Sequence, residues 1–225
     1  MEQQISIEKK TIQEDMTYHG KVILTYRIHY PQFQSIRFQR TLNRINSFYR
    51  AKANAFSAYC RTKLFRQAVE QFEYSKKHQY PIMKYEAVVD YEVTFQQDCT
   101  LSLYYDQYTY TGGAHGSTVR KSDTWDLKTG QNLPMRRFFS RYLDYRNYVI
   151  KSIIAQIEQQ NQNGQGTYFE DYETNVMQEM NINSFYLVPE GVMVYFQQYD
   201  IAPYSSGIVE FLIPFVKGMV YHPTC

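Results

Sequence analysis

The 225-residue sequence has no apolar run long enough to cross a membrane as a helix. Its longest apolar segments, residues 192–196 and 207–216, end or are interrupted well short of the ~20 residues that a bilayer requires. Residues 1–16 also lack the apolar core of a secretory signal. We therefore expect no membrane span, and a cytoplasmic location if the chain is complete as written; an export element that precedes the sequence is the alternative.

Cysteine is scarce, with only Cys60, Cys99 and Cys225, at spacings that match no metal module. This odd set favours unremarkable thiols in a reducing compartment, and one disulfide with a leftover thiol is the alternative. The five histidines show no i, i+4 spacing and no neighbouring cysteine pair. We expect neither a metal site nor a cofactor.

The common catalytic motifs are absent: GxSxG, HExxH, GxxxxGK(S/T) and GxGxxG do not occur. The nearest glycine-rich element, TGGAHG at residues 111–116, lies between two predicted strands, whereas a phosphate cradle lies between a strand and a helix. It is interpreted as a tight loop or a ligand-contacting loop. We expect no catalytic residue; an enzyme acting on wall glycan, the alternative, needs two carboxylates ~5–9.5 Å apart, and Asp90 and Glu92 are weak candidates.

What the sequence does contain is a globular composition, 44% hydrophobic and 17% aromatic, which excludes intrinsic disorder. Residues 22–30 alternate with period 2 and predict a half-buried strand. Pro31 is expected to end this strand, because proline cannot donate to a ladder. Residues 36–77 contain no glycine or proline and carry apolar residues every three or four positions, which predicts one long amphipathic helix or two joined by a slight bend.

Strand patterns return after Pro81. Residues 85–95 alternate cleanly, Gln97 and Asp98 suit a hairpin turn into a strand near residues 101–105, and a third strand is predicted at residues 117–127. Two shorter helices then precede two or three final strands. Helices and strands in blocks predict an α+β fold, with an antiparallel sheet packed by one long helix and a second α+β lobe bearing two shorter helices. The change near Tyr80 predicts domains at residues 1–80 and 81–225, or one compact unit with two lobes.

Charge is distributed unevenly. Residues 36–69 contain eight Lys and Arg and no acid, whereas residues 167–225 contain seven Asp and Glu and one Lys. The basic segment is interpreted as a solvated helix face, with an anionic partner as the alternative. Nucleic acid is disfavoured, because the aromatic residues of this helix lie on its buried face, where they cannot stack on bases.

Three stretches of the sequence resemble a known family. Residues 26–31 (YRIHYP), with a helix starting near residues 42–46 (LNRIN), resemble the N-terminal domain of RsiV-type anti-sigma ectodomains and PdaC-type peptidoglycan deacetylases. Residues 110–116 (YTGGAHG) with 125–130 (WDLKTG) resemble the C-terminal RsiV-like domain. Residues 185–191 with 199–207 (YDIAPYSSG) are similar to its last hairpin and loop.

The resemblance implies a non-enzymatic, extracytoplasmic binding module, because RsiV-type ectodomains are receptors for lysozyme. The sigma-binding segment and membrane span of those proteins do not occur in the sequence, so we expect it not to act as an anti-sigma factor as it stands; it also lacks a deacetylase catalytic domain. A lysozyme or a wall glycan is the expected partner. Animal-type lysozymes are basic, so we expect binding at the acidic C-terminal part, with the TGGAHG loop beside it. The predicted ligand-binding residues are Tyr110, Thr111, Gly112, Gly113, His115, Tyr199, Asp200, Pro203 and Tyr204.

Overall fold

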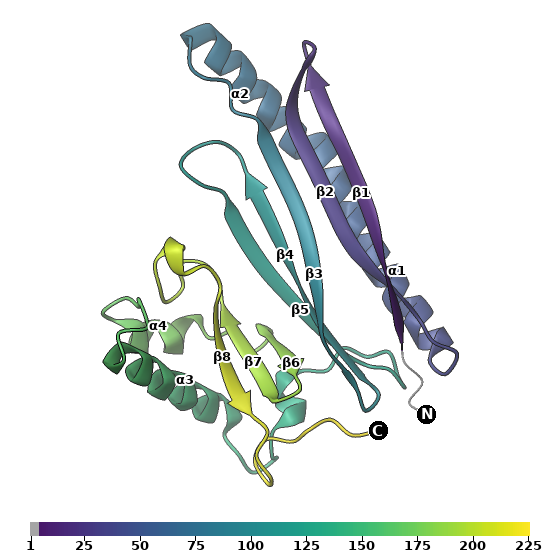
Figure 1. The fold of residues 1–225 in the computed structure, drawn as a ribbon, viewed down its shortest axis with the longest axis vertical. Helices are drawn as coiled ribbons and strands as arrows, with labels where there is room; N and C mark the ends of the chain where they lie inside the picture. The colour runs from purple at the N-terminus through teal and green to yellow at the C-terminus, as the bar shows by residue number, and fades with distance from the viewer. Residues whose placement is uncertain (1–4) are drawn as a thin grey trace. The chain divides into compact units, whose positions relative to one another are not determined.

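A computed structural model describes residues 5–225 and has the α+β fold predicted from the sequence (Figure 1). Residues 1–4, at the start of the predicted first domain, lie outside the described part. One sheet has five strands in the order β1-β2-β3-β4-β5, and a second has three in the order β6-β7-β8. The strands of the first sheet are Ser6–Tyr18, Lys21–Gln34, Tyr85–Gln97, Thr100–Tyr110 and Ser117–Asp126; those of the second are Phe185–Val188, Gly191–Phe196 and Val209–Pro214.

The chain forms two compact units. Unit 1 comprises Met1–Tyr91 and Tyr105–Val119, and unit 2 comprises Glu92–Tyr104 and Arg120–Cys225.

Unit 1 begins with the antiparallel pair β1 and β2, joined by a turn at His19 and Gly20, both of which have positive φ. The prediction that this strand ends at Pro31 is wrong. Strand β2 continues to Gln34, and Pro31 pairs with Lys9 of β1. Pairing of β2 with β3 covers only residues 24–28, so at Pro31 the strand has a partner on one side only. A proline that lacks a donor is tolerated in such an edge-like position.

The predicted long helix is confirmed as three continuous segments: α1 at Gln39–Tyr59, a π-helical turn at Cys60–Leu64, and α2 at Phe65–His78. The helix ends at Gln79, whose left-handed conformation (φ 58°) caps it. It joins β2 to β3, which pair in parallel. Parallel neighbours need such a long crossover, so the helix accounts for the parallel pairing of β2 with β3.

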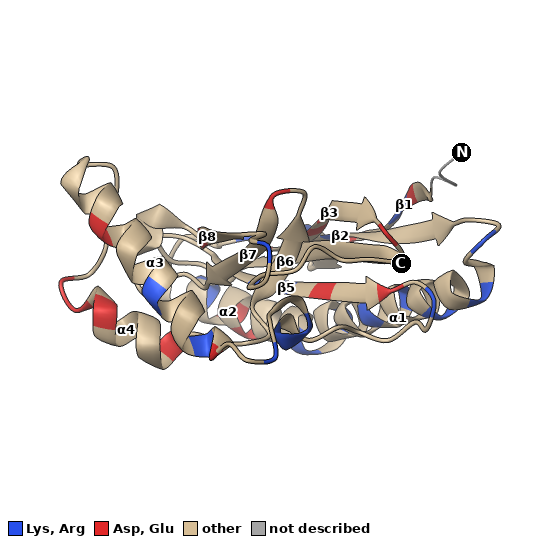
Figure 2. Cartoon of the chain, turned by 90° about the horizontal axis from the view of Figure 1, so that it is seen from below, with Lys and Arg blue, Asp and Glu red and all other residues tan. Residues whose placement is uncertain are grey.

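The core of unit 1 lies between this helix and strands β2 and β3. Apolar residues of the helix, among them Ala53, Leu64 and Phe72, pack with Leu24 and Ala87 of the strands in one buried cluster. The basic residues of the helix are mostly exposed, and Figure 2 shows Lys and Arg along α1 and α2. The apolar stripe and the basic face predicted from the sequence are therefore on different sides of the helix.

Cys60 lies in the π-helical turn with none of its surface exposed, and this burial raises the pKa of its thiol to about 12. With that pKa, about one molecule in 10,000 carries the reactive thiolate at pH 8. We expect the native protein to show no measurable reaction with a thiol reagent such as DTNB, and one thiol to react after unfolding in urea. A rapid reaction in the native state would contradict the burial of Cys60.

Unit 2 packs helices α3 (Tyr145–Gln162) and α4 (Tyr172–Glu179) with the three-stranded sheet. Both helices agree with the two predicted shorter helices. The core contains Val149 and Ile153 of α3, Val176 of α4, and Val194 and Phe211 of the sheet. Within residues 5–225, none of the helices combines the length and hydrophobicity needed to cross a membrane.

A disulfide joins Cys99 to Cys225 across 126 positions of the sequence, while Cys60 is a free thiol. The expectation of three unremarkable thiols is therefore wrong, and the alternative of one disulfide with a leftover thiol holds. Cys99 lies in the turn between β3 and β4, where Asp98 and Cys99 both have positive φ. The disulfide lies entirely within unit 2.

Candidate functional site

The predicted TGGAHG loop connects β4 to β5 in unit 1. Gly112 and Gly113 have φ of 95° and 96°, which glycine adopts without strain. The Tyr110 hydroxyl donates to the Gly113 carbonyl (3.1 Å), and His115 Nδ1 lies 2.9 Å from the Gly116 carbonyl. These contacts are those of a tight loop held by its own groups, with Thr111, Gly113 and His115 exposed.

The second predicted site is the loop of residues 199–207 in unit 2, between β7 and β8. Tyr199 has positive φ (70°) and is 56% exposed, and its ring centroid lies 5.8 Å from that of Tyr204. Between these tyrosines, Ile201 and Ala202 are buried in the core of unit 2. The loop therefore presents two neighbouring tyrosine rings on a buried base, and Pro203 leads into a short 3-10 helix at Tyr204–Ser206.

Hydrogen bonds fix this loop at its first residues. The Asp200 carboxylate accepts from the Gln197 backbone N–H (2.7 Å), and the Asp200 N–H donates to the Gln197 carbonyl (3.2 Å). Burial raises the pKa of Asp200, although the bond from Gln197 opposes the shift. Further along, the Ile201 carbonyl accepts from the Phe169 N–H (3.1 Å). The loop is thus held in one conformation, as a binding surface requires if it is to lose little entropy on association.

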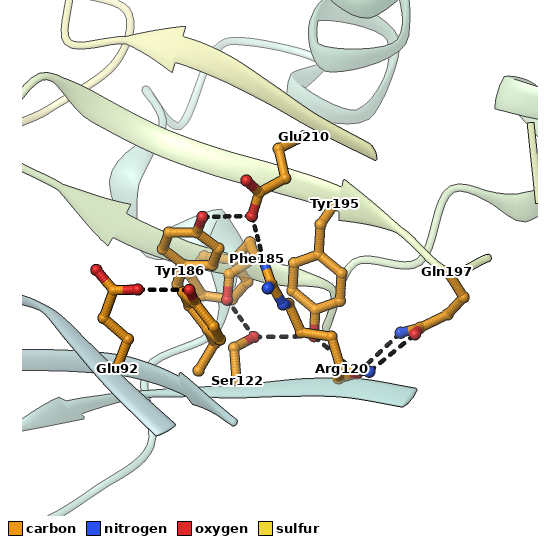
Figure 3. A network of polar contacts seen from close by, with 9 residues as sticks. Glu92, Arg120, Ser122, Phe185, Tyr186, Tyr195, Gln197 and Glu210 are labelled. Atoms are coloured by element: carbon orange, nitrogen blue, oxygen red, sulfur yellow. Dashed lines mark hydrogen bonds and ion pairs between the residues drawn. The ribbon is translucent and has the colours of Figure 1, made fainter. Parts of the chain in front are cut away.

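Gln197 connects the loop to β5. Its side-chain oxygen accepts from the Arg120 N–H (2.9 Å), and its side-chain nitrogen donates to the Arg120 carbonyl (2.8 Å), as Figure 3 shows. The amide group of Gln197 therefore takes the place of a strand residue in pairing with the Arg120 backbone.

The Arg120 side chain is the centre of a polar network in unit 2 (Figure 3). Its guanidinium forms an ion pair with Glu210 and lies 3.7 Å from the centroid of the Tyr104 ring. The Tyr186 hydroxyl also donates to Glu210 (2.5 Å), and burial followed by this bond raises the pKa of Tyr186. The Arg120 side chain is only 10% exposed, so its charge is balanced inside the protein.

The hydroxyl groups of Ser122 and Tyr104 make further hydrogen bonds in this network. The Ser122 hydroxyl donates to the Phe185 carbonyl and lies 3.1 Å from the Tyr195 hydroxyl. The Tyr104 hydroxyl donates to Glu92 (2.5 Å). This network was not predicted from the sequence; the available signals were the 23 tyrosines of the chain and an arginine among the small polar residues of one strand.

The carboxylates considered for an enzyme both have partners. Asp90, in unit 1, has an oxygen 2.6 Å from His29 Nδ1, and Glu92, in unit 2, accepts from Tyr104. Among residues 5–225, no group of three or more His, Cys, Asp or Glu side chains is placed to hold a metal ion.

Two family models match the chain. Residues 19–118 match the family described as Deacetylase PdaC, and residues 137–216 match a protein family of unknown function, DUF3298. The PdaC match agrees with the N-terminal resemblance inferred from the sequence.

A similar curated protein is the peptidoglycan-N-acetylmuramic acid deacetylase PdaC of Bacillus subtilis strain 168, which is 23% identical over 181 residues. The match covers 79% of this chain and 34% of that protein, so the chain spans about a third of the length of this relative.

Two crystal structures of DUF3298 family proteins have the same fold. The structure from Bacteroides fragilis has a TM-score of 0.72 at 20% identity and covers 98% of this chain and 95% of its own. The structure from Pseudomonas aeruginosa has a TM-score of 0.60 at 16% identity, covering 97% and 94%. At these identities the similarity establishes the fold alone.

Proposed function

We propose that this protein is a non-catalytic binding module of the cell envelope, and that it binds a basic protein of the lysozyme type through the loop of residues 199–207. The observation that carries the proposal is the pair of neighbouring rings, Tyr199 and Tyr204, on a loop fixed by Asp200 and Gln197. Rigid aromatic side chains of this kind are favoured as anchors at protein interfaces.

Charge supports the same partner. Residues 167–225 carry seven acids against one lysine, and two of the acids, Glu173 and Glu179, lie on α4, where Figure 2 shows acidic positions. A basic protein would be attracted to this part of unit 2, which raises the rate of association at low salt. The Cys99–Cys225 disulfide supports an oxidising, extracytoplasmic compartment.

Replacing Tyr204 with alanine is expected to weaken binding to an animal-type lysozyme about 30-fold, the effect of losing one aromatic anchor of ~2 kcal/mol. The urea midpoint should stay unchanged, because Tyr204 is partly exposed in a loop whose base is held by Ile201 and Ala202. Isothermal titration calorimetry measures the affinity.

The matched control is Tyr142→Ala, which removes another tyrosine of unit 2 that is 82% exposed. It should bind as the wild type does. Equal affinities for wild type and Tyr204→Ala, or no binding by the wild type, would refute the assignment of this loop.

Wall glycan is the second candidate partner. It is favoured by the name of the Bacillus subtilis relative, a deacetylase of peptidoglycan N-acetylmuramic acid. Co-sedimentation with purified peptidoglycan tests it, because a glycan-binding protein pellets with the wall material and a protein-only binder stays in the supernatant.

A further inference from the structure

Strand β1, in unit 1, is an open edge of the five-stranded sheet (Figure 1). It pairs with β2 along its whole length, from Ser6 opposite Gln34 to Tyr18 opposite Lys21. Within residues 5–225, no strand pairs with its other side. The strand has 13 residues and is roughly 40 Å long, beyond the usual range of about 3–10 residues. The outward N–H and C=O groups of every second residue therefore form a long row without a partner strand.

Most features that usually close such an edge are missing from β1. The strand contains no proline. The register shift at Met16 and Thr17 places the extra residue, Ile23, in β2, so the backbone of β1 itself stays regular. The long helix packs chiefly on β2. Charged side chains are the remaining protection, and their order along the strand decides whether they repel a second strand or attract it.

The charges of β1 mirror each other about Ile12. Two lysines, Lys9 and Lys10, precede this residue, and two acids, Glu14 and Asp15, follow it at the same distances. This order is complementary to an antiparallel copy of the same strand. With Ile12 opposite the same residue of the copy, Lys9 faces Asp15. In this register Lys10 also faces Glu14, and two-fold symmetry makes each pair occur twice.

The neighbouring registers lose this match. Registers that keep both helix-bearing faces on the same side of the joined sheets differ by two positions, because side chains alternate between the faces. One neighbouring register places Glu8 opposite Glu14, and the other places Ile12 opposite Glu14. Neither brings opposite charges face to face. The charge order of β1 therefore selects one register for a second copy.

Lys9 and Asp15 are available for these pairs. Both lie on the face of β1 that is turned away from the helix and is exposed, whereas Ile12 lies on the other face and packs against the core of unit 1. The Lys9 side chain is 55% exposed, and its Nζ lies 3.8 Å from Asp90, which keeps its contact with His29 if the lysine turns away. In the part of the chain that the structure describes, the Asp15 carboxylate makes no ion pair or hydrogen bond.

We propose that two copies of this protein join through their β1 strands, antiparallel about a two-fold axis at Ile12. The open backbone groups of the two edges supply the hydrogen bonds, and the Lys9–Asp15 pair, formed twice, fixes the register. The partner of this edge is thus a second copy of the same chain. The inference concerns unit 1 and is independent of the binding proposed for the loop of residues 199–207.

Sedimentation equilibrium of the full chain tests the proposal. The wild type should approach the mass of two chains as the concentration is raised to about 500 μM. Lys9→Glu and Asp15→Lys each turn both attractive pairs into repulsive ones, so each alone should weaken dimerisation about 30-fold. An equimolar mixture of the two variants should dimerise about as well as the wild type, because one strand then carries only acids at positions 9 and 15 and the other only lysines. Lys10 and Glu14 are left unchanged, since they already have partners, Glu8 and Arg61.

The matched control is Lys84→Glu, which makes the same change of charge at an exposed position outside β1 and should dimerise as the wild type does. Hydrogen exchange of the wild type needs no variant: open-side amides of residues 6–18 should exchange more slowly in concentrated than in dilute solution. This measurement decides the matter if a variant fails to fold. A monomer at every concentration, exchange independent of concentration, dimers unaffected by either variant, or folded variants that do not recover on mixing would overturn the proposal.

Discussion

Replacing Arg120 with alanine is expected to destabilise unit 2 by about 3 kcal/mol. The guanidinium is balanced by Glu210 and lies on the Tyr104 ring, with little exposure to solvent. The substitution removes the cation, opens space beside the ring, and leaves Tyr186 and Glu210 to share one hydrogen bond without the positive charge. The loss combines the stacking on Tyr104 and the packing of a buried side chain with the ion pair, whose acid, Glu210, has a side chain that is 34% exposed and can still be hydrated.

The single tryptophan makes this loss measurable in unit 2. Trp125 lies in β5, is 7% exposed and belongs to unit 2, so its fluorescence during urea titration reports the unfolding of that unit. Arg120→Lys should lose about 1–2 kcal/mol, because lysine keeps the charge but not the planar group that stacks on the ring.

The control for this experiment is Arg146→Ala, at an exposed position of α3. It should change the free energy of unfolding by no more than about 0.5 kcal/mol, as is usual for surface positions. If Arg120→Ala unfolds at the same urea concentration as this control, the arginine network does not support the fold of unit 2.

The surroundings of Arg120 are an example of what the sequence pattern could not predict. Residues 117–127 were predicted as a strand, and β5 confirms it, but polar residues on one face of a strand do not reveal whether solvent or protein covers that face. In the structure, Thr124 and Ser102 are buried and hydrogen-bonded (2.7 Å), and Ser102 accepts from the Leu187 N–H. These contacts join positions up to 85 residues apart, which no local pattern encodes.

Elements with strong local signals were predictable. The long helix followed from an uninterrupted apolar period without glycine or proline, whereas its π-helical turn at Cys60–Leu64 has no marker in composition. The strand end predicted at Pro31 was wrong because the cost of the missing N–H donor depends on whether strands lie on both sides of the proline, and here a strand lies on one side only. The loop of residues 199–207 was singled out as a candidate site by its resemblance to a known family, whereas the hydrogen bonds of Gln197, which lead from this loop to Arg120, join positions 77 residues apart.

Breaking the Cys99–Cys225 disulfide is expected to lower the free energy of unfolding of unit 2 by about 4 kcal/mol. The crosslink spans 126 positions, and closing a loop of that size restricts the unfolded chain by roughly 4–5 kcal/mol; removing a native disulfide typically costs about 2–5 kcal/mol. The measurement is the urea midpoint of Trp125 fluorescence with and without dithiothreitol, repeated on Cys99→Ser.

Thiol counting tells whether the shift comes from this bond. The unfolded protein should contain one reactive thiol, that of Cys60, and three after reduction. Cys60→Ala, which changes unit 1, should respond to dithiothreitol as the wild type does, and Cys99→Ser should not respond at all. Because the disulfide closes within unit 2, a midpoint insensitive to reduction, or three thiols in the unreduced chain, would contradict the pairing and remove its support for the proposed extracytoplasmic compartment.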